Sequence, residues 1–574
     1  MTDEPMDPRD PRNTDRNTDR NMDWGTDTGA GPDPRLYAEY APEPGGRPEQ
    51  RAEPTATARE SLSRARLPRP AVKRAPAPAQ GGAGGGRRIQ VAVGVIAVIC
   101  AAVAYGYGVK PAAATSRSAA ASKATAVQSA TLVCSEVVGV SDASINAITP
   151  ATDAGGKPAA GDQAILTALH AKAPIATIKQ VGTLSAHSGL SGDTADLNQD
   201  SIPVVGRAAG ALAPGFTMTD TLSNGSSNAT HGLASTPCTV PGTDFWYLGA
   251  DPGNKAVAKI AIANTDQLTA QVNATAYTAQ GVVTGNAAQI GSGLLVPAGD
   301  HRDPIDLSAF SGSGDPIAVH LVATAGRISP ALLDSDAGSG RDFIQAQTPQ
   351  AHVVLPGVPA MTGTGSALKL QLVLFAPNAD TDVTLHWIGA NKISPTVTVP
   401  HLTAGKVQQV DISNIPAAGE AGALQIDSAN DVPILAEIKV TGVGGLDTAY
   451  LGPVQPLAGE AVVADNNSGS AVELTNNAGK DAQVKVTVEG TGAPASQTVT
   501  VPASSTKAVT LQAPKGASTF AVTVTPLGGA DQVYAARVMT QNGGLLTVQP
   551  MFTALETVQI PAVRSDLSGI VPQP

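Results

Sequence analysis

The feature that most constrains the fold is an approximate repeat that fills the chain from Lys255 onward. Each copy has a strand that ends at an asparagine, then a turn, an alternating apolar and polar strand, a Val-Pro turn and a second alternating strand; the asparagines are Asn264, Asn378 and Asn476. Alternation with a period of two is typical of half-buried strands, and asparagine favours turns. The asparagines recur about every 100 residues, which is the length of an immunoglobulin-like sandwich. We therefore expect three tandem immunoglobulin-like β-sandwiches, at 255–350, 351–455 and 456–574.

The region 129–254, which precedes the repeat, is also predicted to be a β-rich domain. It opens with the strand-like run TLVCSEVVGV and ends at CTVPGTDFWYLGAD. Charged residues make up only 15% of the chain and aromatic residues 3%, while glycine, alanine, proline, threonine and valine dominate. This composition favours short strands joined by turns over helical bundles. The predicted fold class is all-β.

A single apolar run, Ile89–Val109, contains no charged residue. As a helix it would span about 31 Å, which matches the hydrocarbon core of a bilayer, so 89–109 is predicted to be one transmembrane helix. The run is longer, and begins later, than the apolar part of a usual secretory signal. Small residues at 111–115 leave cleavage by a signal peptidase open as an alternative, and a buried core helix is another.

The flanks of this run predict the orientation of the chain. Between Ser61 and Arg88 there are seven basic residues and no acidic one, and basic residues are sparser beyond the run. The positive-inside rule then places residues 1–88 in the cytoplasm and the large C-terminal part outside the cell membrane. Residues 1–88 have scarcely any aliphatic side chains and are predicted to be a disordered tail, and residues 110–128 a linker.

The three cysteines agree with this location. Cys100 falls in the predicted membrane helix, whereas Cys134 and Cys238 fall in the predicted extracytoplasmic part. An even pair in an oxidising compartment predicts one disulfide between Cys134 and Cys238. Two unpaired buried thiols are the alternative, and a metal site would need more ligands than this pair supplies.

Two sets of residues are candidates for binding sites. Asp334, Asp336 and Asp342 lie in a glycine-containing stretch and would offer carboxylates to a calcium ion, although a hydrated turn also explains them. Trp246, Tyr247 and Trp387 are candidates for stacking on sugar rings. A tryptophan in a sandwich core near a disulfide is the commoner role for Trp246.

Sequence motifs for catalysis are missing. The eight histidines never form a metalloprotease HExxH pattern, and the chain has neither a G-x-S-x-G elbow nor a Walker loop. A triad dispersed along the chain stays open, because its members need not be close in sequence. We expect no cofactor. The formal net charge of −11 also argues against nucleic acid as a partner.

Several of these segments together resemble a family of actinobacterial extracytoplasmic proteins, single-pass or secreted, that is known only as a domain of unknown function. The likeness covers roughly residues 130 to 555 and rests on CTVPGTDFWYLGAD, KIAIAN, LLVPAG…IDLSAF, GRDFI and VPHLTAG…VDIS. The resemblance implies work in the cell envelope beside a membrane glycosyltransferase. It implies no catalytic residues.

These observations lead to three expectations of function. The first is a non-enzymatic, membrane-anchored cell-envelope protein that binds or scaffolds an envelope protein or a cell-wall glycan. The second is a carbohydrate-binding accessory of a membrane glycosyltransferase. The third is a hydrolase with a dispersed site.

Overall fold

The structure is a computed structural model, and it describes residues 123–560 with internal gaps. The gaps are 136–142, 153, 171–173, 189–201, 226–230, 254–255, 312–313, 337, 361–367, 391–396, 416–419, 443–446, 491–492, 530–531 and 542–543. The predicted tail 1–88 and the predicted membrane helix 89–109 lie outside the described residues. Within the described part, no helix is long and apolar enough to cross a membrane.

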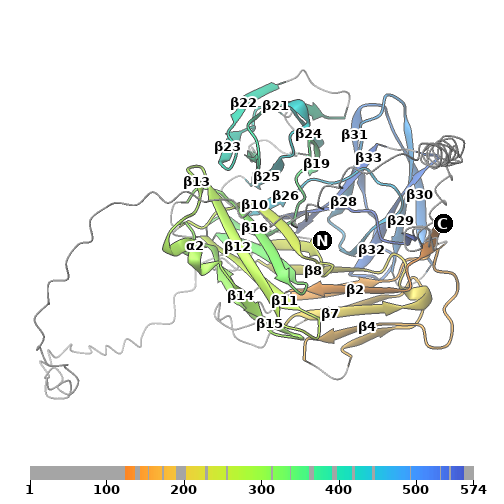
Figure 1. Cartoon of the computed structure of the whole chain (residues 1–574). Coiled ribbons are helices and arrows are strands. Elements are labelled where there is room, and N and C mark those ends of the chain that lie inside the picture. Colours follow the sequence, from red (N-terminus) through yellow and green to blue (C-terminus); the bar gives the residue numbers. More distant parts are fainter. Residues whose placement is uncertain are drawn as a thin grey trace, which may run out of the picture. The chain divides into compact units, whose positions relative to one another are not determined.

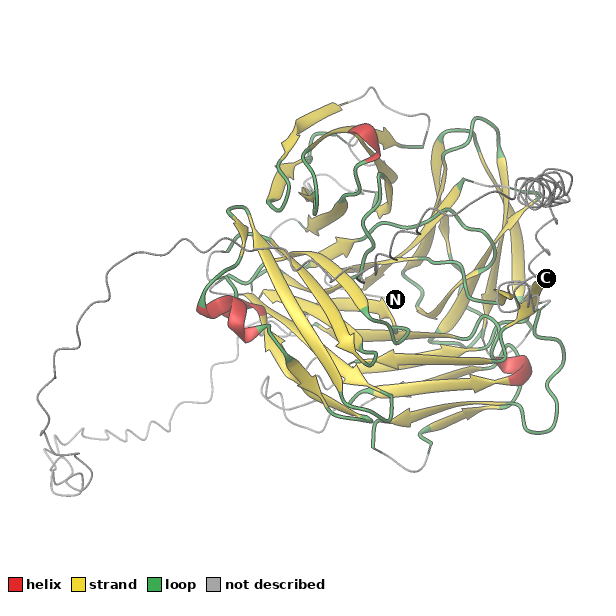
Figure 2. Ribbon diagram, in the orientation of Figure 1, coloured by secondary structure: helices red, strands yellow, loops and turns green. Residues whose placement is uncertain are grey.

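The described chain is all-β, as predicted (Figure 2). Eight of its nine sheets form four consecutive pairs, and each pair packs around a hydrophobic cluster, so we call the pairs the first to fourth sandwich. All four share one strand order. In each, the first, sixth, third and fourth strands make one sheet, and the fifth, second, seventh and eighth make the other. The N-terminal β-rich region thus has the same topology as the three repeats, which its sequence does not reveal.

The first sandwich encloses a cluster that includes Leu166, Ile145, Met218 and both Cys134 and Cys238. Its strands are β2 (Ser129–Cys134), β3 (Ala143–Ile148), β4 (Gln163–Ala168), β5 (Ala176–Ile178), β6 (Leu184–Ser188), β7 (Val204–Ala209), β8 (Thr217–Asn224) and β9 (Gly232–Pro237), with the short helix η1 (Gly210–Leu212).

The second sandwich splits its fourth strand into two pieces, β13 and β14, which both pair with β12. Its elements are β10 (Asp244–Ala250), β11 (Ala256–Asn264), β12 (Ala270–Thr278), β13 (Gly281–Val282), α2 (Asn286–Ile290), β14 (Leu294–Val296), β15 (Asp300–Asp306), η2 (Leu307–Ala309), β16 (Ile317–Ala325), β17 (Ser329–Asp336) and β18 (Gly340–Ile344).

The third and fourth sandwiches follow along the chain (Figure 1). The third consists of β19 (His352–Val358), β20 (Lys369–Phe375), β21 (Thr381–Ile388), β22 (Val397–Leu402), β23 (Val407–Asp411), β24 (Gly422–Ser428), η3 (Ala429–Asp431), β25 (Leu435–Thr441) and β26 (Thr448–Leu451). The fourth consists of β27 (Ala461–Asn466), β28 (Ser470–Asn476), β29 (Ala482–Glu489), β30 (Ala495–Val501), β31 (Ser505–Thr510), β32 (Phe520–Leu527), β33 (Val533–Gln541) and β34 (Leu545–Pro550).

The predicted alternation is visible in the burial of single strands. In β29, Val484 and Val486 are buried in the fourth sandwich, whereas Gln483 and Lys485 between them are exposed. Successive side chains of a strand point to opposite faces, so this pattern puts one face in the core and the other in water.

Two of the three repeat asparagines have the same structural role. The side-chain amide of Asn264 donates to the carbonyl oxygens of Leu268, Val296 and Pro297, and that of Asn476 donates to those of Lys480, Val501 and Pro502. Each therefore ties the end of its strand to the Val-Pro turn.

Asn378 does not have this role, so its place in the predicted repeat is wrong. The strand residue opposite the start of the fifth strand is Asn264 in the second sandwich, Asn476 in the fourth and Phe375 in the third. Phe375 is fully buried, whereas Asn378 is exposed in the turn that follows. An apolar side chain thus replaces the hydrogen-bonding asparagine in the third sandwich.

Strand pairing also differs from the predicted segment boundaries at two places. Strand β10 precedes the predicted boundary at 254/255, yet it pairs with β16 of the second sandwich. Strand β1 (Lys123–Ala126), within the predicted linker, pairs antiparallel with β35 (Thr557–Ile560). Both pairings join segments far apart in the chain, which local sequence patterns do not record.

Candidate functional site

The three rings predicted to stack on sugars are buried. Trp246, Tyr247 and Trp387 are 8%, 2% and 3% exposed. Trp246 stacks on His320, with ring centroids 3.8 Å apart. The ring of Trp387 lies so close to Gly422 that a Cβ atom there would be 2.2 Å from its Cζ2. The stacking role predicted for these rings is therefore wrong, because each packs inside a sandwich or between two of them.

The three aspartates predicted to bind calcium do not converge on one point. Asp336 caps its own turn by accepting hydrogen bonds from Gly338 N and Ser339 Oγ. Asp334 is buried and accepts from the Tyr450 hydroxyl and from Asp251 N. Among the residues that the structure describes, the group of metal-ligating side chains with ligand atoms within 4.8 Å of one another lies elsewhere, at His170, Asp300 and His301.

Asp342, the third of these aspartates, joins the four sandwiches. Its carboxylate accepts from Ser235 N of β9 at 3.2 Å, Thr547 Oγ1 of β34 at 3.0 Å and Tyr450 N of β26 at 3.1 Å, as well as from Phe343 N of its own strand β18. These are the eighth strands of the four sandwiches, and they contact one another in the cyclic order β9, β18, β26, β34. Burial raises the pKa of Asp342 well above its usual value.

Asp447, which the sequence did not single out, has an equivalent role. Its carboxylate accepts from Leu233 N, Leu546 N, Arg341 N and Thr448 N, again one group from each eighth strand. We call Asp342, Asp447 and these donors the junction cluster. Gly340 is required beside it, since its φ is +91° and a Cβ would lie 2.0 Å from Asp447 Oδ1. Asp342 and Asp447 therefore each accept hydrogen bonds from all four sandwiches.

The predicted disulfide between Cys134 and Cys238 is confirmed. The two Cα atoms are 4.6 Å apart, across a sequence separation of 104 residues. The bond links the end of β2 to the residue after β9, so it fastens the first and last strands of the first sandwich. Cys238 also lines the cavity described next.

A groove lies beside this disulfide. It consists of two adjoining cavities, of about 290 Å³ and about 430 Å³, which share the lining residues Leu132, Phe216, Val240 and Leu555. The first cavity is lined mainly by apolar side chains, with Gln345 and Gln549 among its polar ones. We call the two together the Leu555 groove.

The rim of the Leu555 groove exposes apolar side chains. Val240 and Leu555 are both 61% exposed and Phe552 is 40% exposed. The backbone beneath them is held in place, since Gly215 N donates to Leu555 O at 3.1 Å and Val127 N donates to Glu556 O at 2.9 Å. An apolar surface on a fixed support is typical of a binding site.

The second cavity has a charged end. Arg207 is exposed there, and Arg327 donates to Asp266 with an Nη2–Oδ1 distance of 2.6 Å. The hydrogen bond from Arg327 lowers the pKa of Asp266 below its usual value. The groove thus runs from an apolar mouth to a polar, arginine-lined end.

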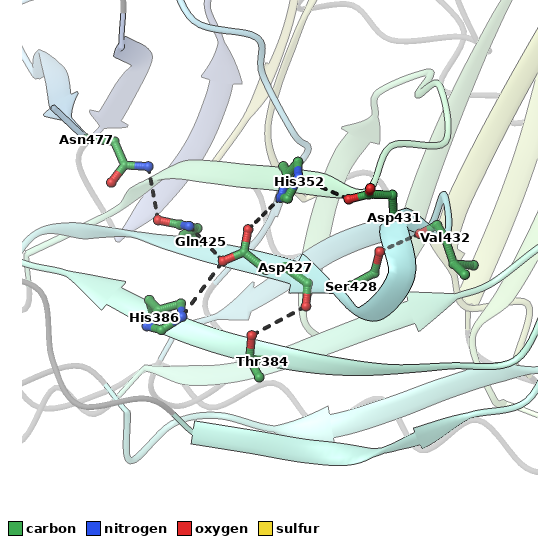
Figure 3. A network of polar contacts seen from close by, with 9 residues as sticks. All are labelled: His352, Thr384, His386, Gln425, Asp427, Ser428, Asp431, Val432 and Asn477. Atoms are coloured by element: carbon green, nitrogen blue, oxygen red, sulfur yellow. Dashed lines mark hydrogen bonds and ion pairs between the residues drawn. The ribbon is translucent and has the colours of Figure 1, made fainter.

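A second exposed polar cluster lies on the third sandwich (Figure 3). His352 Nδ1 is 2.8 Å from Asp427 Oδ1, and Gln425 donates to Asp427 Oδ2 at 2.7 Å. Gln425 also accepts from Asn477 of the fourth sandwich at 3.0 Å. These contacts tie the third sandwich to the fourth, which explains the cluster without a ligand.

Comparison with known families matches residues 191–512 to a family of unknown function (DUF5719). The matched segment is more than half of the chain. Comparisons with curated proteins and with solved structures give no significant match.

Proposed function

The chain belongs to the family of unknown function DUF5719, and from that premise we propose that it is a non-enzymatic, membrane-anchored protein of the cell envelope. We propose that it binds an extracytoplasmic protein partner in the Leu555 groove. In this proposal residues 89–109 are the membrane anchor, the N-terminus is cytoplasmic, and the sandwiches are of the immunoglobulin-like class and lie outside the membrane.

The observation that carries the proposal is the apolar rim formed by Val240, Phe552 and Leu555. Large apolar side chains that lie together in water gain free energy when a partner covers them, at about 25 cal/mol per Å² of buried apolar surface. Because the junction cluster and the disulfide hold the supporting strands, the groove needs little ordering before it binds. Preorganisation of this kind raises affinity.

The groove also indicates the chemistry of the partner. Its apolar mouth fits one or two aliphatic or aromatic side chains, and Arg207 at the other end fits an acidic group nearby. The pair of β1 and β35 adjoins the groove, and Lys123 follows the predicted anchor by 14 residues, which reach at most about 50 Å when extended. A partner in or near the same membrane is therefore within reach.

Site-specific photocrosslinking tests this proposal. A photoreactive amino acid in place of Leu555 is expected to capture a discrete partner in intact membranes. The same residue in place of Val282, which is 50% exposed on β13 and lines neither cavity, serves as the matched control and is expected not to capture it. Phe552→Asp should reduce capture from position 555. Equal products from both positions, or none from position 555, would refute the assignment of the groove.

The carbohydrate-binding alternative depended on aromatic rings that could stack on sugars, and Trp246, Tyr247 and Trp387 are buried. Co-sedimentation of the full chain with cell-wall sacculi separates it from the first proposal. Saturable binding that is unaffected by Phe552→Asp would favour a glycan partner bound outside the groove.

A further inference from the structure

Three side chains from different parts of the chain meet where the first and second sandwiches contact each other. His170 lies in the turn after β4, and Asp300 and His301 begin β15. His170 Nε2 is 2.8 Å from Asp300 Oδ1, and His301 Nδ1 is 3.3 Å from the same oxygen. The two imidazole rings are tilted by 56° with centroids 6.1 Å apart, so they face the carboxylate from two directions.

Buried packing brings these residues together. Leu169, next to His170, packs with Val133, Val205 and Ala263 in a cluster that spans both sandwiches. Ala263 in turn is the residue opposite His301 in the pairing of β11 with β15. Apolar contacts therefore hold together the backbone segments that carry the three side chains.

One feature points to a ligand for this group. His301 Nδ1 is buried and makes no hydrogen bond, although it lies 3.3 Å from Asp300 Oδ1, an oxygen that already accepts from His170 Nε2 and His301 N. His170 has a φ of +72°, a conformation that glycine adopts readily. Buried polar atoms in folded proteins are nearly always paired, which makes an orphaned imidazole nitrogen informative.

We propose that His170, Asp300 and His301 form a divalent transition-metal site that links the first sandwich to the second, with zinc as the best-fitting ion. Two imidazole nitrogens and one carboxylate are a common zinc ligand set. Zinc bonds of 2.0–2.2 Å at tetrahedral angles separate neighbouring ligand atoms by roughly 3.3 Å, which the group meets after small side-chain rotations. His170 is half exposed, so the ion has a path from solvent and a fourth position for water.

Other histidine–aspartate contacts in the described chain lack this arrangement. His401 contacts Asp382 at 2.8 Å and Asp380 at 3.7 Å, but no second imidazole joins them. His352 and His386 contact different oxygens of Asp427, at 2.8 and 3.8 Å. His401 thus provides a matched control, with the same imidazole–carboxylate distance as His170 and Asp300.

Zinc binding by the full chain tests the proposal. The protein is purified in detergent with a tag that contains no histidine, stripped with a chelator, and titrated with Zn²⁺. We expect one saturable site per chain in the wild type and in His401→Ala. Affinity should fall by at least about tenfold in His301→Ala and in His170→Gly, since each loses a ligand. Glycine suits the positive φ at position 170, so the His170→Gly variant keeps the fold.

Cobalt supplies a second readout, because Co²⁺ bound by nitrogen and oxygen ligands in a four-coordinate site absorbs strongly in the visible range. This absorption should be present in wild type and His401→Ala and absent in His170→Gly. Zinc should likewise raise the thermal unfolding midpoint of the first two proteins only. Equal zinc affinity in wild type and His170→Gly, or no saturable binding by the wild type, would overturn the proposal and leave a hydrogen-bonded triad without metal.

Discussion

Replacing Asn476 by alanine tests the claim that one asparagine side chain anchors the turn of a sandwich. The side chain is fully buried. Its amide donates to Lys480 O at 2.8 Å and to Val501 O and Pro502 O at 3.1 Å, and its oxygen accepts from Ala478 N at 3.0 Å. Alanine would remove all four hydrogen bonds.

The magnitude follows from these contacts. A typical hydrogen bond stabilises a protein by about 1 kcal/mol net, and a buried group left without a partner costs about 1–3 kcal/mol. We expect Asn476→Ala to destabilise the fourth sandwich by about 4 kcal/mol. Asn476→Asp should be at least as damaging, because its carboxylate would face three carbonyl oxygens.

Hydrogen exchange measured by mass spectrometry reports this locally, on peptides that cover 476–505. A loss of about 4 kcal/mol corresponds to roughly 10³-fold faster exchange where local opening limits the rate. Asn378→Ala is the matched control, since Asn378 is exposed in the corresponding turn of the third sandwich, and it should change exchange little. A cost below about 1 kcal/mol for Asn476→Ala, or equal effects of the two variants, would refute the reasoning.

Two further predictions concern the buried carboxylates. Burial raises the pKa of Asp334 to about 6 from 3.8, so between pH 4 and 6 the folded state holds a proton that the unfolded state releases. This group should therefore lower the free energy of unfolding by about 3 kcal/mol as pH rises through that window. Urea titrations at several pH values should show that Asp334→Asn lacks this part of the pH dependence. An unchanged pH dependence would contradict the raised pKa of Asp334. Asp447→Ala leaves four backbone N–H groups without their acceptor and should lower the free energy of unfolding by about 3–5 kcal/mol in urea titrations. Asp382→Ala, whose side chain is 69% exposed, should cost no more than about 0.5 kcal/mol, and similar costs for the two variants would contradict the junction role.

Sequence alone determined the features that depend on neighbouring residues. The alternation in segments such as Ala482–Glu489 identified strands, because side-chain direction repeats every second residue in any extended chain. Cys134 and Cys238 were paired correctly, since they are the two cysteines beyond the predicted anchor. The turn asparagines Asn264 and Asn476 were identified for the same local reason, whereas Asn378 was misaligned because Phe375 occupies the equivalent strand position.

Only the tertiary structure decided which residues meet. Trp246 was a candidate for stacking on a sugar ring, yet the pairing of β10 with β16 buries its ring against His320. The sequence does not distinguish Asp447 from other loop aspartates. In the fold, four strands, one from each sandwich, direct backbone N–H groups at its carboxylate. His170 and His301 are 131 positions apart and meet through Leu169 and Ala263. The physical reason is that a local pattern specifies which face of a strand is apolar, while the partner of that face depends on packing between distant segments.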